Sequence, residues 1–416
     1  MKYTAPRGTS DILPDASGVW QFVEKTARET FEAANFREIR TPIFESTDLF
    51  ARSIGSTTDI VTKEMYTFQD RKGRSLTLRP EETAPVVRAC VENNLMVPDN
   101  VVKLYYIGPM FRYERPQAGR YRQFHQVGVE AFGSDDPSID AEIIAVAVSL
   151  FEKLGLENLR VNINSVGCPD CRPSYLEELK KYFGSKIGEM CDECKKRLEF
   201  NPLRILDCKN EACQKYISKA PAPLDYICGK CKADFEKAVK YLKGLKIDFE
   251  INNRLVRGLD YYTGTTFEVI SGKLGAQNAV CGGGRYDNLV EELGGRKTPA
   301  VGFAVGVERI IEILKGSNKL IPSKKLDVFI AAVGEEAMGE GLRLLRELRG
   351  LGVSSDMDFI DRSLKAKMKA ADRSKAKFTL IIGDEEIKKN AVILRTMEDG
   401  SQREVSIDKV AGELSL

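Results

Sequence analysis

The sequence predicts an α+β protein of three parts: a mixed helix-and-strand domain, a helical insertion within it, and a small α/β domain at the end. Helical and strand-like patterns are mixed up to about residue 150, and cysteine and lysine are concentrated over 167–241. Strands then alternate with helices over the last roughly 90 residues. A chain of 416 residues is long enough for two or three domains. We place the three parts at 1–166 with 246–318, at 167–245, and at 326–416.

The elements of the first domain follow from the spacing of its apolar residues, near 3.6 for helices and near two for half-buried strands. The expected helices lie at 17–34, from Ala84, at 139–154, at 174–183 in the insertion, and at 306–314. The expected extended segments lie at 36–44 (interrupted by Pro42), 65–69, 75–78, 102–107, 122–132, and from Phe249 through 266–270 to Gly284.

The terminal domain follows a polar segment, 316–325, whose Pro322 and neighbouring polar residues indicate a linker. Its expected elements are strands at 326–333, 352–359 and 378–383, helices at 336–349 and 363–377, and a hairpin at 391–405 around Asp399–Gly400. This alternation predicts a small α/β domain.

Composition excludes several classes of protein. The chain has 63 Lys and Arg against 61 Asp and Glu, a net charge of +2, which excludes nucleic-acid binding by bulk charge but not by a local basic face. It has no apolar run near the ~18 residues of a membrane helix and no signal-peptide pattern, so we expect a cytoplasmic protein without membrane partners. His125 is the only histidine, so any mechanism that needs a histidine base must use it.

Eight of the ten cysteines form four close pairs in the insertion. These are Cys168/Cys171, Cys191/Cys194, Cys208/Cys213 and Cys228/Cys231. Three C-x-x-C pairs and one C-x₄-C pair suit tetrahedral Zn²⁺, and eight ligands would make two structural sites. Reduced, partly buried thiols are the alternative, and disulfides rank third in a reducing compartment.

The densest polar cluster is FRYERPQAGRYRQFHQVGVE, from Phe111 to Glu130. It places four arginines, including Arg112 and Arg120, around a loop between two expected strands. The planar guanidinium group pairs bidentately with phosphate, so this hairpin suits a triphosphate or an RNA backbone. A solvated hairpin loop is the alternative.

Three further segments carry candidate residues. NNRLVRGLDYYTGTTFEV contains Arg257, Tyr261 and Tyr262, which by themselves also fit core packing. AVCGGGRYDNLV has three glycines without the spacing of a phosphate-binding loop. PAVGFAVGVERI delivers Arg309 near a helix start, where it would pair with a buried carboxylate or a ligand phosphate.

Together these four segments resemble the class II aminoacyl-tRNA synthetases. FRYERPQAGRYRQFHQVGVE and PAVGFAVGVERI are similar to motifs 2 and 3, and FREIRTPIFESTDLF to motif 1. LVRGLDYY and GGGRYD resemble the signature peptides of the histidyl-tRNA synthetases, and RPEETAP resembles their amino-acid loop. The resemblance spans the chain. It implies an antiparallel catalytic sheet flanked by helices, a helical insertion, an α/β anticodon-binding domain, and a homodimer built on motif 1.

The resemblance also implies a reaction. L-histidine would attack the α-phosphorus of ATP to give histidyl-adenylate and pyrophosphate, and histidine would then pass to the 3′ end of tRNA(His). Arg112 and Arg257 would contact the α-phosphate, Arg309 the γ-phosphate, and Arg120 the ATP or the tRNA acceptor end. Mg²⁺ would bridge the phosphates, without a dedicated protein cage.

Histidine would be recognised by a set of polar residues. Glu130 would accept from one ring nitrogen, with the Tyr262 hydroxyl at the other, and an apolar isostere would leave both unpaired. The implied histidine-binding residues are Glu81, Glu82, Thr83, Arg112, Gln126, Glu130, Arg257, Tyr261 and Tyr262. Glu81, Thr83 and Gln126 would hold the α-amino group. Glu82 stands where many relatives carry a small residue, which puts the shape of that loop and the exposure of its carboxylate in question.

The basic helix of the terminal domain suits an anticodon stem, although a solvated helix is the alternative. Arg362 lies just before this helix, and its own basic residues are Lys365, Lys367, Lys369, Arg373, Lys375 and Lys377. Three other functions compete: a histidine-sensing regulatory paralogue, a synthetase for another amino acid such as proline, threonine or glycine, and an RNA-binding scaffold. The three arginines of the ATP site argue against the first and third, and LVRGLDYY with Glu130 against the second.

Overall fold

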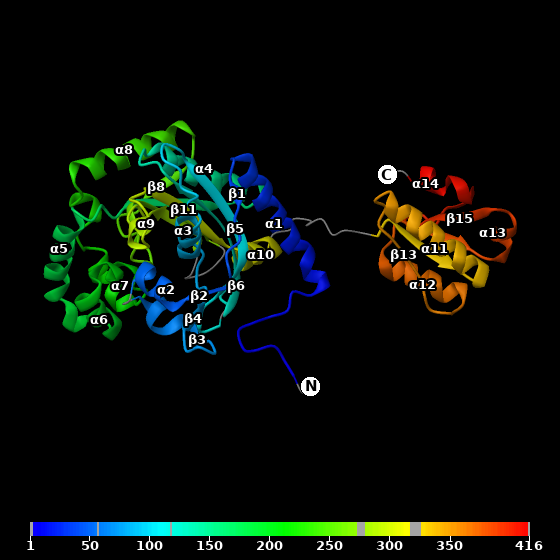
Figure 1. Ribbon diagram of the computed structural model, residues 1–416, viewed down its shortest axis with the longest axis horizontal. Coiled ribbons are helices and arrows are strands. Elements are labelled where there is room, and N and C mark those ends of the chain that lie inside the picture. The colour runs from blue at the N-terminus through cyan, green and yellow to red at the C-terminus, as the bar shows by residue number, and fades with distance from the viewer. Residues whose placement is uncertain (1–2, 56–57, 117–118, 273–278, 317–325, 415–416) are drawn as a thin grey trace. The chain divides into compact units, whose positions relative to one another are not determined.

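Figure 1 shows the computed structural model of the chain, which describes residues 3–55, 58–116, 119–272, 279–316 and 326–414. The chain divides into two compact units, Met1–Ile321 and Pro322–Leu416. Apart from Gly316, the expected linker lies outside the described residues.

The first unit is built on an eight-stranded sheet among the described residues, in the order β1-β5-β6-β11-β10-β9-β7-β8. In that order the strands are Arg37–Glu38, Val102–Phe111, Gln123–Phe132, Ala300–Gly306, Ala279–Arg285, Thr263–Ser271, Leu159–Ser165 and Phe249–Ile251. Neighbours are antiparallel except at the two edges, where β1 and β8 pair in parallel with β5 and β7. The antiparallel catalytic sheet implied by the resemblance is therefore confirmed.

One face of the sheet is covered by four helices (Figure 1), which are α1 (Pro14–Ala33), α4 (Ser138–Lys153), α8 (Gly229–Gly244) and α10 (Val307–Lys315). The apolar spacing predicted for α1 buries Val23, Ala27 and Phe31 in this core. Although α8 is the last helix of the cysteine-rich insertion, it packs beside α4. The insertion therefore returns into the helical layer of the main sheet.

The opposite face carries α3 (Thr83–Glu92), α9 (Leu289–Glu292) and the rest of the insertion, which share a second core. The insertion contains α5 (Arg172–Gly184), α6 (Asp192–Phe200), α7 (Glu211–Ile217), and the 3₁₀ turns η2 (Ile187–Glu189), η3 (Pro202–Asp207) and η4 (Pro223–Asp225). This face also holds most of the side chains that the sequence predicted to bind ATP or histidine.

A three-stranded sheet flanks this face, in the order β2 (Phe44–Ser46), β4 (Ser75–Leu78) and β3 (Tyr66–Gln69). The helix α2 (Thr47–Ile54) and a π-helical turn, η1 (Ile60–Glu64), lie between β2 and β3 in the chain. The extended run expected over 36–44 is split between two sheets. Pro42, which cannot donate a ladder hydrogen bond, lies between the end of β1 at Glu38 and the start of β2 at Phe44.

The second unit is a five-stranded sheet among its described residues, in the order β13-β12-β14-β15-β16. Its elements are β12 (Val328–Ala332), α11 (Glu335–Gly350), β13 (Ser355–Met357), α12 (Leu364–Ser374), β14 (Phe378–Ile382), α13 (Asp384–Lys388), β15 (Ala391–Thr396), β16 (Gln402–Ser406), the turn η5 (Ile407–Lys409) and α14 (Val410–Glu413). Alternate residues of β12 pack against different helices, Ile330 on the α11 side and Phe329 on the α12 side. The two helices therefore cover opposite faces.

Two predictions for this unit need adjustment. The strand expected over 352–359 is limited to Ser355–Met357, and the basic helix ends at Ser374 because Lys375 adopts a left-handed conformation with φ of 54°. Across the described ranges of both units, none of the helices combines the length and the apolar character that a membrane crossing requires.

Candidate active site

A cavity lies over β6, β11 and β10, on the side of the sheet away from α1 and α4. Small residues form part of its floor, because Gly282 of β10 and Ala304 of β11 lie in register and both line the cavity. Gly302 pairs with Glu130 in the neighbouring row, and a side chain at Gly302 would overlap with the Glu130 carboxylate. Small residues in register thus leave room above the sheet for a ligand.

The structure brings together all but one of the side chains predicted to bind ATP or histidine. Those lining the cavity are Glu81, Thr83, Arg112, Arg120, Gln126, Glu130, Arg257, Tyr261, Tyr262 and Arg309. They come from α3, the β5–β6 hairpin, the segment before β9, and α10. Segments separated by more than 200 residues therefore meet over one sheet face.

Glu82 is the exception, and its assignment to the histidine-binding set needs correction. It is 1% exposed, and its Oε1 accepts hydrogen bonds from Arg79 Nη1 at 2.9 Å and Thr41 Oγ1 at 2.7 Å. The carboxylate faces away from the cavity because it precedes the first turn of α3, where Glu81 and Thr83 take the inward positions. Glu82 is therefore held away from the ligand by buried hydrogen bonds with Thr41 and Arg79, and its carboxylate is not exposed.

Glu130 is the most deeply buried carboxylate of the cavity, at 1% exposure. Thr83 Oγ1 donates to its Oε1 at 2.7 Å, and the Tyr286 hydroxyl donates to Oε2. Burial raises the pKa of Glu130 to about 8, although both hydrogen bonds oppose the shift. Sequence reasoning missed Tyr286, and its position two residues after the three glycines in GGGRYD was the available signal.

A second carboxylate, Glu81, lies beside Glu130 in the same part of the cavity. It accepts from the backbone N–H groups of Thr83 at 2.8 Å and Ala84 at 2.9 Å, which fixes it at the start of α3. Burial raises the pKa of Glu81, against the pull of these bonds. The rings of Tyr261 and Tyr262 pack against each other nearby, with centroids 4.8 Å apart and planes tilted by 46°. This end of the cavity can hold a cation or a polar ring.

The other end of the cavity is cationic. Arg112 donates to Pro80 O at 2.8 Å and lies over the Phe124 ring, and Arg120 forms an ion pair with Glu114 at 2.9 Å. Arg309 donates to Gly119 O at 3.4 Å. The pKa of Arg309 is lowered by burial and then by the positive charges of Arg120 and Arg112. Like charges held this close favour binding of an anion such as a polyphosphate.

Arg257 lies between the two ends. Its Nη1 is 3.5 Å from Glu268 Oε2, and its guanidinium carbon is 6.0 Å from the centre of the Tyr262 ring. The guanidinium lies directly over Gly282, where any side chain would overlap with it. One of the three glycines of β10 is thus explained by the approach of this arginine.

His125 takes no part in lining the cavity. It alternates with the inward residues of β6, so its ring packs edge-on against Trp20 at 4.8 Å. Its Nδ1 is 3.0 Å from Glu308 Oε1, which also accepts from the His125 backbone N–H. The single histidine of the sequence has a structural position, so the cavity offers no histidine base.

Comparison with known proteins identifies the family. Residues 8–310 match the family described as "Histidyl-tRNA synthetase", and residues 327–415 match "Anticodon binding domain". The chain is 51% identical over 415 residues to the histidine–tRNA ligase of Halothermothrix orenii, an alignment that covers 100% of this chain and 99% of that protein. The chain belongs to the histidyl-tRNA synthetase family.

Further comparisons agree with this assignment. The histidine–tRNA ligase of Thermoanaerobacter sp. strain X514 is 53% identical over 407 residues, covering 98% of this chain and 97% of that protein. The crystal structure of apo histidyl-tRNA synthetase from S. aureus aligns over 99% of both chains with a TM-score of 0.84 and 40% identity. The predicted family and fold are therefore confirmed, and the chain is a class II enzyme of the ATP-dependent ligase type.

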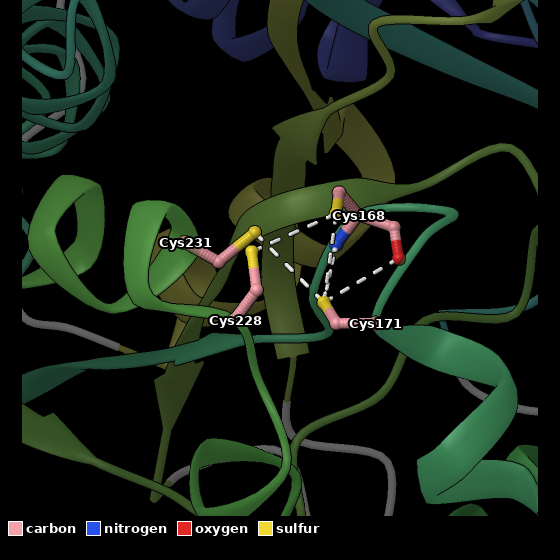
Figure 2. Close-up of side chains that lie close together, drawn as sticks. All are labelled: Cys168, Cys171, Cys228 and Cys231. Carbon is pink, nitrogen blue, oxygen red and sulfur yellow. Dashed lines mark hydrogen bonds between the residues drawn. The ribbon is translucent and has the colours of Figure 1, made fainter.

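Away from the cavity, the insertion gathers its eight cysteines into two groups. Figure 2 shows the first cysteine group, Cys168, Cys171, Cys228 and Cys231; the second cysteine group is Cys191, Cys194, Cys208 and Cys213. Within each group the sulfur atoms all lie within 4.8 Å of one another. The sequence had left open which pairs would meet, and the structure joins the first pair to the fourth and the second to the third.

The basic helix α12 differs from its sequence description at one residue. Lys367 is 2% exposed, and its Nζ donates to the carbonyl oxygens of Ile360 at 3.0 Å and Asp358 at 3.2 Å. Lys367 therefore holds the loop before α12 and does not belong to the exposed stripe. Lys365, Lys369 and Arg373 remain exposed, one helical turn apart on one face.

Proposed function

We propose that this chain is a histidine–tRNA ligase that activates L-histidine with ATP to histidyl-adenylate and pyrophosphate, and transfers histidine to the 3′ end of tRNA(His). One observation carries the proposal: in a histidyl-tRNA synthetase fold, a single cavity joins two buried carboxylates at one end to three arginines at the other. The first suits an amino acid with a polar ring, and the second suits a triphosphate.

Adenylation in this cavity needs positioning and positive charge. The carboxylate of histidine is already ionised at neutral pH, so its attack on the α-phosphorus requires no protein base. Arg112 and Arg257 would stabilise charge at the α-phosphate and Arg309 would hold the γ-phosphate, with Arg120 at the mouth. Mg²⁺ would neutralise phosphate charge, and the Glu114 carboxylate at the arginine end offers oxygen for it.

Histidine would be held by hydrogen bonds at both its ends. Glu130 and the Tyr262 hydroxyl would contact the two ring nitrogens, while Glu81, Thr83 and Gln126 would take the α-ammonium group. Gln126 Oε1 is buried and accepts no hydrogen bond within the described part of the chain, which supports its use by a ligand donor. An amino acid without ring nitrogens would leave buried polar groups unpaired and bind far more weakly.

ATP–pyrophosphate exchange with each of the twenty amino acids, without tRNA, tests this proposal. Exchange should depend on histidine, because only histidine pairs with both Glu130 and Tyr262. Exchange with another amino acid would overturn the pocket assignment while keeping the class II chemistry. Histidine binding without exchange would indicate the regulatory paralogue instead.

The terminal unit would bind the tRNA through the exposed row of α12. Changing Lys369 to Glu should weaken tRNA binding and reduce the dependence of log affinity on log salt by about one, the effect of one lost phosphate contact. Histidine-dependent exchange without tRNA should persist. Filter binding across a salt series measures the first, and the exchange assay measures the second.

Arg346→Glu is the matched control for Lys369→Glu. Arg346 is equally exposed but lies on α11, which covers the opposite face of the same sheet. The same charge reversal there should leave tRNA affinity nearly unchanged. Equal weakening by both variants would indicate a general electrostatic effect and remove the reason to assign the α12 face.

The enzyme would act as a cytoplasmic homodimer. Ile43 and Phe44, in the segment that resembles motif 1, are exposed apolar side chains, and Phe44 packs against exposed Phe68 with ring centroids 6.4 Å apart. A self-complementary partner surface would bury such a cluster.

A further inference from the structure

The geometry of the two cysteine groups points to metal ions. We propose that each group binds one Zn²⁺, and that the two ions brace the loop Asp260–Thr263, which carries Tyr261 and Tyr262, at its two ends. The first statement rests on the cysteines alone. The second rests on the proposed function, because it assigns those tyrosines to histidine.

The sulfur spacing fits zinc, and none of the eight cysteines is joined in a disulfide. Cys168 Sγ lies 3.6 Å from Cys171 Sγ and 4.0 Å from Cys228 Sγ, and Cys171 Sγ lies 3.9 Å from Cys231 Sγ. Four thiolates bound at about 2.3 Å around a tetrahedral ion are about 3.8 Å apart. A disulfide would need about 2.05 Å. In the second group, Cys191 and Cys208 are 3.8 Å apart.

The surrounding backbone holds the sulfur atoms in place. Cys171, Cys191 and Cys228 occupy the N-cap positions of α5, α6 and α8, so three of the eight cysteines are anchored at helix starts. The Cys168 N–H donates to Cys171 Sγ at 3.2 Å, and the Cys191 N–H donates to Cys213 Sγ at 3.3 Å. Four thiols would release their protons to water as each ion binds.

The first cysteine group lies directly behind the tyrosine loop. The carbonyl oxygen of Gly167, next to Cys168, accepts a hydrogen bond from the Gly264 N–H at 3.0 Å. A side chain at position 167 would overlap with the Cys171 sulfur, and the φ of 71° also favours glycine there. Arg172, next to Cys171, donates to the carbonyl oxygen of Tyr262. An ion that fixes Cys168 and Cys171 therefore fixes both ends of Tyr262–Gly264. It also joins the two ends of the insertion, since Cys228 follows 60 residues later.

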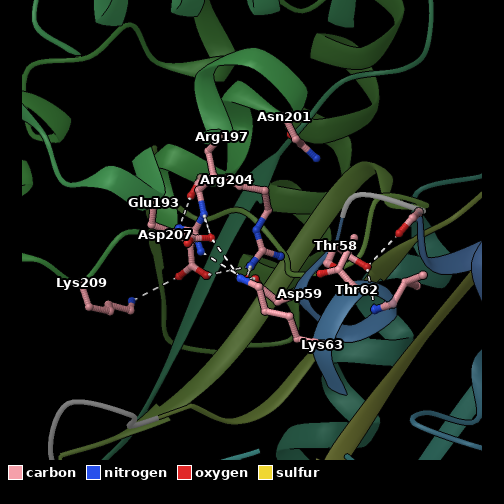
Figure 3. Close-up of polar contacts among 12 residues, drawn as sticks. Thr58, Asp59, Thr62, Lys63, Glu193, Arg197, Asn201, Arg204, Asp207 and Lys209 are labelled. Atoms are coloured by element: carbon pink, nitrogen blue, oxygen red, sulfur yellow. Dashed lines mark hydrogen bonds and ion pairs between the residues drawn. The ribbon is translucent and has the colours of Figure 1, made fainter. Parts of the chain in front are cut away.

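The second cysteine group holds the other end of the loop. Between Cys194 and Cys208 lies Asn201, whose Nδ2 donates to Asp260 Oδ1 at 2.7 Å. Figure 3 shows the neighbouring ion pairs, in which Arg197 and Arg204 approach Asp59 at 3.3 and 3.9 Å. The segment between Cys194 and Cys208, which the second ion would close, thus contacts Asp260 of the tyrosine loop. It also contacts Asp59, directly before the π-helical turn η1.

Metal analysis tests the first statement. Untagged chain, purified without chelators, should contain two zinc ions by mass spectrometry, and Cys228→Ser and Cys213→Ser should each retain one. Cys90→Ala is the matched control, because Cys90 is buried in α3 outside both groups, and it should retain two. One zinc ion or fewer per wild-type chain, or undiminished zinc in either serine variant, would overturn the proposal.

The bracing is tested by the KM for histidine in the exchange assay. Each serine variant should raise it roughly tenfold to a hundredfold through misplacement of the tyrosines, with the KM for ATP nearly unchanged. Arg172→Met and Asn201→Ala break the links while sparing the cysteines, so they should raise the same KM yet retain two zinc ions. These two variants remain informative if a serine variant fails to fold. An unchanged histidine KM in both link variants would overturn the bracing, whereas wild-type protein with two zinc ions and no exchange would overturn only the proposed function.

Discussion

Arg257→Ala should lower the kcat of histidine-dependent pyrophosphate exchange by on the order of 10²–10³, the cost of one preorganised charged contact at a transition state. The reason is that Arg257 reaches the middle of the cavity, between the carboxylates and the other arginines, where the α-phosphate would gain charge. The KM for histidine should change less than kcat. Steady-state exchange at varied histidine and ATP separates the two parameters.

A second variant tests the position of this guanidinium without removing its charge. Gly282→Ala places a side chain where the Arg257 guanidinium lies, so it should reproduce much of the Arg257→Ala defect. Arg160→Ala is the control, since this exposed arginine on β7 pairs only with exposed Glu250 at 3.7 Å among the described acidic groups. Near wild-type exchange in Arg257→Ala would contradict the assigned role.

Glu130→Gln should reduce kcat/KM for histidine by on the order of 10²–10³, because the buried carboxylate that accepts a hydrogen bond from the imidazole is replaced by a neutral amide. The amide keeps the size of the side chain and can still meet the Thr83 and Tyr286 hydroxyls after these rotate. The loss should therefore reflect recognition and not collapse of the site. Exchange kinetics at varied histidine measure it, and retained activity would move the specificity contact elsewhere.

The same variant should be more stable than the wild type when the site is empty. Burial raises the pKa of Glu130 to about 8, above its value in the unfolded chain. Between the two values the folded state holds a proton that the unfolded state has released, so the free energy of unfolding falls as pH rises from about 4 to about 8. Glutamine carries no such penalty. The melting temperature of Glu130→Gln should exceed that of the wild type at pH 8.5, with a smaller difference at pH 5.

The local elements could be predicted because each follows from residues close in the chain. The 3.6-residue spacing of α1, the extended segment that forms β6, and the hairpin around Asp399–Gly400 are properties of single segments, and the structure contains all three. The ends were less certain, as in β13 and α12, where contacts with other elements decided where regular structure stops.

The sequence by itself determined the family and predicted most of the residues that line the cavity, since its motifs are short and contiguous. It could not determine which way neighbouring side chains point or which distant segments meet. At the start of α3 the backbone directs Glu81 and Thr83 toward the cavity and directs Glu82 away from it, to a buried contact with Arg79. Packing of α12 buries Lys367 beneath the loop that precedes this helix. Spacing showed four cysteine pairs, but only the closure of the insertion brings Cys168 and Cys171 to Cys228 and Cys231. Side-chain direction and long-range closure are set by packing between segments, which only the tertiary structure decides.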